Sequence, residues 1–206
     1  MKSERILALD ISTKTGYCVA MSSDEGIHLE SHGQIPKVEC PDERYPDSYV
    51  SWAYTCYEAI EKLFNEYAPD VLIVEETTRS KNSFSQKILE FCHFLVAKLI
   101  KETGIKCVYF QTGDWRKEVG SYMNEEERQH NKEVKGYKKK NKTAVAYDIN
   151  GKRVGMIGKK HVTIRLINQV FGKFFKEPMR KKNEDECDAM ALALCYHKKR
   201  ERGLYV

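Results

Sequence analysis

Hydrophobic and polar residues follow two different periods along this chain. Residues 6–9, 17–21 and 27–35 form short apolar or alternating runs separated by turn residues, a pattern typical of antiparallel strands. Later apolar runs at 71–74 and 106–111 alternate with longer segments whose apolar residues recur every three or four positions. This order predicts an α/β fold with a mixed five-stranded sheet, an antiparallel meander followed by parallel strands, flanked by helices.

The helical period continues far enough to predict four helices. Gly104 and Gly172 stand where the second and third would need a cap. The aromatic residues of the first, Tyr49, Trp52, Tyr54 and Tyr57, are interpreted as helix packing or a partner surface. The expected spans are 47 or 48 to about 67, 83–102, 160–171 and 185 to about 197.

The segment at about 121–157 interrupts this pattern. It is strongly polar, acidic at its start and lysine-rich from 132 to 142. Asn150-Gly151 is a good turn signal for a hairpin within it. We therefore expect a single domain over 1–206 with a basic insertion at about 121–157.

Composition and charge narrow the class of protein only slightly. The formal net charge of +5 permits an anionic partner without requiring one. No apolar run approaches the roughly 18 residues of a membrane helix, and the N-terminus lacks the shape of a signal peptide. Seven cysteines without CxxC spacing argue against zinc and fit a reducing cytoplasm.

Four carboxylates are the candidates for chemistry. Asp10 and Glu75 each end a short apolar strand, where ligands can approach the edge of a sheet. Asp185 and Asp188 are three residues apart at the start of the last helix, so they share a face. Each has a simpler explanation, as a turn residue, a helix cap or a partner of the helix dipole. The pair on one helix fits those explanations less well, because two close acids repel each other unless a cation lies between them.

Three motifs that contain these acids resemble RuvC-type Holliday junction resolvases of the ribonuclease H-like superfamily. They are ILALDISTKTGY with Asp10, VLIVEETTRSKN with Glu75, and DECDAMALA with Asp185 and Asp188. The spacing to Lys81-Asn82 selects Glu75 over Glu76. The insertion has no counterpart in the compact bacterial members, and Thr78 stands where those often carry an aromatic residue. The departures suggest a mobile-element or viral relative.

The resemblance implies an enzyme that cleaves branched DNA, above all four-way junctions. Its four acids would bind two Mg²⁺ ions, which Mn²⁺ can replace, for hydrolysis of a phosphodiester bond. Lys160 would assist at the scissile phosphate, with Lys159 an equal neighbour in the sequence; the alternative for either is a solvated surface lysine. Symmetric cleavage of a junction also implies a homodimer with two opposed sites.

Further basic residues are candidate DNA contacts, each with the alternative of being a solvated surface residue. The lysine run has Tyr137 within it and could follow a phosphate backbone. Trp115 follows the fifth strand, directly before Arg116 and Lys117, and is interpreted as a core residue. The candidates are Arg79, Lys81, Lys87, Arg116, Lys117, Lys138, Lys139 and Lys140, with Lys132, Lys135 and Lys142 in the same run.

Other functions remain open on these residues alone. A sugar-kinase or actin-like ATPase shares the opening strand and turn, but it needs a second lobe and a further Gly-rich loop that this chain lacks. A non-catalytic nucleic-acid-binding relative would not need the intact set of four acids, which is costly if unused. A nuclease acting on RNA–DNA hybrids or flaps is the remaining alternative.

Overall fold

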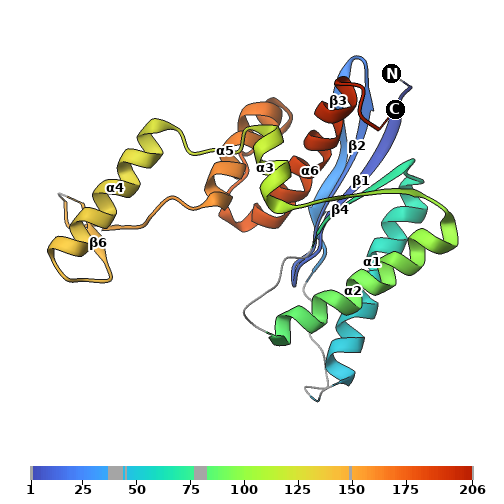
Figure 1. The fold of residues 1–206 in the computed structure, drawn as a ribbon, viewed down its shortest axis with the longest axis horizontal. Helices are drawn as coiled ribbons and strands as arrows, with labels where there is room; N and C mark the ends of the chain where they lie inside the picture. Colours follow the sequence, from blue (N-terminus) through green and yellow to red (C-terminus); the bar gives the residue numbers. More distant parts are fainter. Residues whose placement is uncertain (1, 37–43, 45, 77–82, 149, 206) are drawn as a thin grey trace.

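A computed structural model describes the chain except for residues 1, 37–43, 45, 77–82, 149 and 206. A five-stranded sheet with the order β3-β2-β1-β4-β5 lies at its centre (Figure 1). The pairs β1–β2 and β2–β3 are antiparallel, whereas β1–β4 and β4–β5 are parallel. This is the expected mixed sheet. The strands are β1 (Glu4–Asp10), β2 (Gly16–Ser23), β3 (Gly26–Gln34), β4 (Val71–Glu75) and β5 (Lys106–Phe110).

The central strands are apolar on both faces because helices cover the sheet on both sides. Ile6 and Ala8 of β1 point into one core cluster, and Leu7 and Leu9 point into the other. All four are fully buried, so an uninterrupted apolar run is what a strand at this position requires. The next residue along β1, Asp10, ends the strand directly after this apolar run.

Two helical layers enclose the sheet (Figure 1). One layer packs on Leu7 and Leu9 and contains α1 (Asp47–Tyr67) and α2 (Ser83–Thr103). The other packs on Ile6 and Ala8 and contains α3 (Thr112–Val119), α5 (Lys159–Phe171) and α6 (Glu184–Glu201). Short 3₁₀ turns at Gly172–Phe174 and Lys181–Asn183 connect α5 to α6.

The ends of the helices agree with the expected spans to within a few residues. Ala68 closes α1 in a left-handed conformation with φ 43°, and Gly104 follows α2 with φ +67°. Gly172 behaves differently from the expected left-handed cap. Its φ is −56°, and the chain continues into a 3₁₀ turn instead of reversing.

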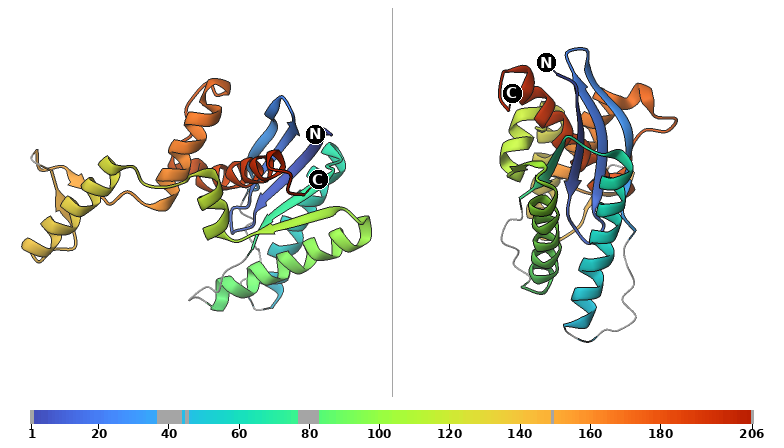
Figure 2. Two further views of the ribbon diagram at one scale, coloured as in Figure 1. Left: turned by 45° about the horizontal axis from the view of Figure 1, so that its top comes forward. Right: turned by 90° about the vertical axis from the view of Figure 1, so that its right-hand side faces the viewer.

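The residues from 125 to 154 project from the body as an arm (Figure 2). The arm contains α4 (Glu125–Lys140) and a hairpin of β6 (Ala146–Tyr147) and β7 (Arg153–Val154). The side chain of Asn131 donates to the Ile157 carbonyl and accepts from the Ile157 N–H, and Arg165 of α5 pairs with Glu127 at 2.9 Å. The base of the arm is therefore held by bonds between its own two chain segments and by an ion pair with α5.

The arm confirms the expected hairpin turn, but α4 and α3 were not predicted. Among the buried residues of α4 only Val134 is apolar, so the helix has almost no hydrophobic period. It is stabilised at its ends instead. Asn124 and Glu127 form a capping box, and acidic residues at the start and lysines at the end complement the helix dipole. None of the helices within the described residues is long and apolar enough to cross a membrane.

Candidate active site

The sheet brings two of the four carboxylates together at one end. Asp10 ends β1 and Glu75 ends β4, and these are neighbouring parallel strands with Leu9 opposite Val74. The carboxyl ends of parallel strands meet at the same edge, so the two acids become neighbours. Figure 1 shows both chain termini at the opposite end of the sheet.

The first two turns of α6 bring the other two acids to this edge. Asp185 and Asp188 are 8% and 2% exposed, and both lie inside the helix, whose N-cap position is occupied by Asn183. Asp185 is therefore not the N-cap residue. Gly16 makes the close approach of α6 to the sheet possible, since a Cβ at position 16 would lie 2.1 Å from the Asp185 carbonyl oxygen.

Two cations of the chain itself lie against the acids of α6. The Lys160 ammonium contacts a carboxylate oxygen of Asp185 and lies 3.5 Å from one of Asp188. The Nη2 group of Arg116 donates to both carboxylate oxygens of Asp188, at 3.2 and 3.1 Å. Lys159 is exposed, so of the two neighbouring lysines it is Lys160 that faces the acids.

Burial and crowding of negative charge dominate the electrostatics. Burial raises the pKa of Asp10 well above its ordinary value, and the charges of Glu75 and Asp188 and a hydrogen bond with Glu75 raise it further. Burial also raises the pKa of Asp188, opposed by Arg116 and Lys160. Burial lowers the pKa of Lys160, but its bond to Asp185 and the charges of Asp188 and Asp10 outweigh this and raise it above the ordinary value. The site therefore carries more negative charge than its cations neutralise.

This donor set fits a hard divalent cation in its chemistry. Mg²⁺ prefers carboxylate oxygens, and a buried group of acids with an excess of negative charge attracts it. In the part of the chain that the structure describes, no three His, Cys, Asp or Glu side chains are arranged as a ready metal-binding group. The Lys160 ammonium lies against both acids of α6, so metal binding would require it to withdraw from Asp185. Each Asp188 oxygen has a second lone pair besides the one that accepts from Arg116, so these bonds can persist.

Arg116 lies in a different place from the one we expected. Instead of reaching the surface, it is 8% exposed and bonded to Asp188 and Thr163. Lys117 and Lys87 are exposed, on α3 and α2. Lys138, Lys139 and Lys140 end α4 in the arm, away from the acids (Figure 1). Arg79, Lys81 and Thr78 lie outside the described residues.

Sequence reasoning missed the residues of α3 that contact Glu75. The Thr112 hydroxyl donates to Glu75 Oε1, and the Trp115 indole N–H donates to the same oxygen at 3.2 Å. Trp115 is fully buried as expected. A buried indole needs an acceptor for its N–H, so the expected burial of Trp115 could have indicated a polar partner for it. Glu76 is exposed, so Glu75 is the acid of the pair that faces the site.

Solved structures share this fold along nearly the whole chain. RuvC of Thermus thermophilus in complex with a Holliday junction substrate matches with a TM-score of 0.64 at 11% identity, covering 97% of this chain and 96% of that one. A second structure of the same organism's RuvC gives 0.63 at 13% identity, with the same coverage. The yeast mitochondrial Holliday junction resolvase Ydc2 gives 0.61 at 10% identity, covering 97% and 80%. No protein-family model and no curated protein matches the sequence. The likeness confirms the expected ribonuclease H-like fold of RuvC.

Proposed function

We propose that this protein is a metal-dependent endonuclease that hydrolyses phosphodiester bonds in branched DNA, above all in four-way junctions. One observation carries the proposal. Four carboxylates from β1, β4 and α6 gather at one edge of a sheet whose fold is shared with a RuvC solved on a Holliday junction. At this low sequence identity the shared fold does not by itself indicate an activity, so the proposal depends on these side chains.

The chemistry follows from the residues at that edge. Asp10, Glu75, Asp185 and Asp188 would hold two Mg²⁺ ions, for which Mn²⁺ can substitute. When bound, the ions would supply a nucleophile from water at neutral pH and stabilise the charge on the leaving oxygen. Lys160 neutralises part of the carboxylate charge and would complement the scissile phosphate from the start of α5.

DNA would contact the surface around this edge and the arm. Lys117 and Lys87 are exposed on the body, and Arg79 and Lys81 remain candidates from the sequence. The arm returns to the body at residues 155–158, directly before α5, which carries Lys160. Its lysines at the end of α4, Lys138 to Lys140, would therefore extend the binding surface from the side of the molecule that holds the acids, with Lys132, Lys135 and Lys142 alongside them.

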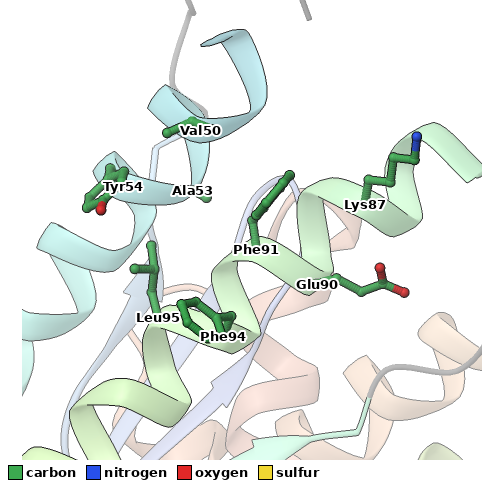
Figure 3. Close-up of a pocket in the computed structure, with 8 residues that line it drawn as sticks. All are labelled: Val50, Ala53, Tyr54, Lys87, Glu90, Phe91, Phe94 and Leu95. Atoms are coloured by element: carbon green, nitrogen blue, oxygen red, sulfur yellow. The ribbon is translucent and has the colours of Figure 1, made fainter. Parts of the chain in front are cut away.

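We also propose that the protein acts as a homodimer through the outer surface of α1 and α2. Tyr54, Phe91 and Phe94 expose 53%, 38% and 69% of their surfaces there. They line a pocket of about 550 Å³ between the two helices (Figure 3). Apolar patches of this kind mark association surfaces, and the pocket lies across the sheet from α6. A second copy on this face would leave both acidic edges open to one junction.

The dimer is tested by sedimentation equilibrium of the wild type and of Phe94→Glu. Burying a charge in an apolar interface is costly, so the variant should sediment as a monomer while the wild type sediments at twice the chain mass. Phe174→Glu is the matched control, because Phe174 is 54% exposed on the 3₁₀ turn after α5. A monomeric wild type, or a dimeric Phe94→Glu, would contradict this assignment.

The enzymatic proposal is tested with a panel of labelled substrates in Mg²⁺. It contains a four-way junction, a flap, an RNA–DNA hybrid and a linear duplex, each with wild type and Asp10→Asn. We expect symmetric cuts in the junction by the wild type and none by the variant. Preference for the hybrid or flap would reassign the substrate, and no cleavage of any substrate in Mg²⁺ or Mn²⁺ would refute the proposal.

A further inference from the structure

Helix α3 contacts carboxylates of two different elements of the site, although it has only eight residues. At its start, the Thr112 hydroxyl donates to Glu75 Oε1. One turn later, the Trp115 indole N–H donates to the same oxygen at 3.2 Å. Both donors address one oxygen of Glu75, so they fix the rotation of the carboxylate and leave Oε2 outside these two bonds.

The next residue of α3 holds the acid on α6. Arg116 donates through Nη2 to both oxygens of Asp188 and through Nη1 to the Thr163 hydroxyl at 2.6 Å. Its guanidinium carbon lies 4.2 Å from the centroid of the Trp115 ring. The Trp115 ring, the Thr163 hydroxyl and the Asp188 carboxylate therefore fix the orientation of the guanidinium plane. A flexible surface arginine would lack these three contacts.

This arrangement differs from ordinary core packing in where its polar atoms point. The Trp115 side chain is fully buried and Arg116 is 8% exposed, so each of their bonds is made in a medium of low dielectric. Two of the four acids receive these bonds. Ligands of a metal ion must be held in the orientation that the ion needs, and this is the task of the groups behind them.

We propose that α3 is the positioning element of the metal site, with Thr112 and Trp115 orienting Glu75 and Arg116 orienting Asp188. The inference rests on the proposed function, in which these acids hold Mg²⁺. Arg116 acts through Asp188 and is a positioning residue, not a DNA ligand. Loss of such partners typically weakens metal affinity or activity by roughly 10-fold to 100-fold.

The test is Mn²⁺ binding to the full-length protein without DNA, measured by titration calorimetry and by the electron paramagnetic resonance signal of free Mn²⁺. Thr112→Val removes the hydroxyl but keeps the side-chain shape, and Trp115→Phe removes the N–H but keeps a ring beneath Arg116. We expect each to weaken Mn²⁺ binding by roughly 10-fold or more. Thr112→Ser restores the hydroxyl and should bind as the wild type does. Asp114→Asn, on the same helix but exposed, is the matched control.

Thermal unfolding of each variant separates positioning from packing. Trp115→Phe removes buried volume and can lower the melting temperature. Thr112→Val is nearly isosteric, so a loss of Mn²⁺ binding in this variant would not be explained by lost packing. If Thr112→Val and Trp115→Phe lose stability but bind Mn²⁺ as the wild type does, α3 is packing only and the inference is overturned. If the wild type binds no Mn²⁺, the proposed function itself fails, and the inference with it.

Discussion

Neutralising the three lysines that end α4 tests whether the arm binds DNA. The change is Lys138→Gln, Lys139→Gln and Lys140→Gln together, which retains helix propensity. Lys142 is left in place because its φ is +46°, where a substitution would confound charge with backbone strain. The capping box and the bond between Arg165 and Glu127 lie at the other end of α4, so the fold of the arm should persist.

The size of the effect follows from the geometry of a helix. Three consecutive residues spread over about 200° of its circumference, so a duplex on one side reaches two of them and an arm inserted into a groove reaches all three. Each phosphate contact contributes about 0.9 to the log–log salt slope, so the slope should flatten by roughly 1.8 to 2.7. Between 50 and 200 mM salt, the wild type should lose roughly 10-fold to 40-fold more affinity than the variant.

Fluorescence anisotropy of a labelled junction without divalent metal measures this slope. Turnover at saturating DNA should stay near that of the wild type, because the arm contributes no acid to the site. The matched control neutralises Lys2, Lys173 and Lys176, which are exposed outside the arm and outside the proposed dimer surface. If the arm variant shows the same slope as the control, the three lysines are merely solvated and the arm does not bind DNA through them.

Three further predictions concern the acids and their support. Glu75→Gln should abolish cleavage while Glu76→Gln leaves it intact, as a metal-dependent cleavage assay would reveal. The raised pKa of Asp10 means that its ionisation destabilises the metal-free fold, so melting temperature should fall as pH rises from the usual carboxyl range towards that pKa. Asp10→Asn should flatten this dependence, and an unchanged pH profile would contradict it. Gly16→Ala should cost about 1–3 kcal/mol in chemical unfolding, because its Cβ meets the backbone of α6; wild-type stability would contradict the close approach.

The sequence was most informative where local pattern and burial coincide. Residues 6–9 and 71–74 are apolar runs because both faces of the central strands are covered, and each run stops at a carboxylate. The spacing of Asp185 and Asp188 likewise placed them on one helix face. These features depend on neighbours along the chain, so periodicity alone could predict them.

The missed features depend on contacts between distant parts of the chain. In α3 only Trp115, Arg116 and Val119 are buried, so its eight residues show little hydrophobic period. The burial of Arg116 depends on Asp188, which is 72 residues away. An arginine next to a lysine after a strand resembles a surface pair, and only the tertiary structure reveals its acidic partner.

Anomalous scattering from crystals grown with Mn²⁺ would locate the ions that the four acids are proposed to bind. We expect Mn²⁺ peaks at the edge where β1, β4 and the start of α6 meet, with Asp10 and Glu75 among the ligands and the Lys160 ammonium withdrawn from Asp185. Crystals of Asp10→Asn should lose this density. Mn²⁺ bound elsewhere in a protein that still cleaves junctions, or no ion at this edge at saturating Mn²⁺, would show that these acids do not form the catalytic metal site.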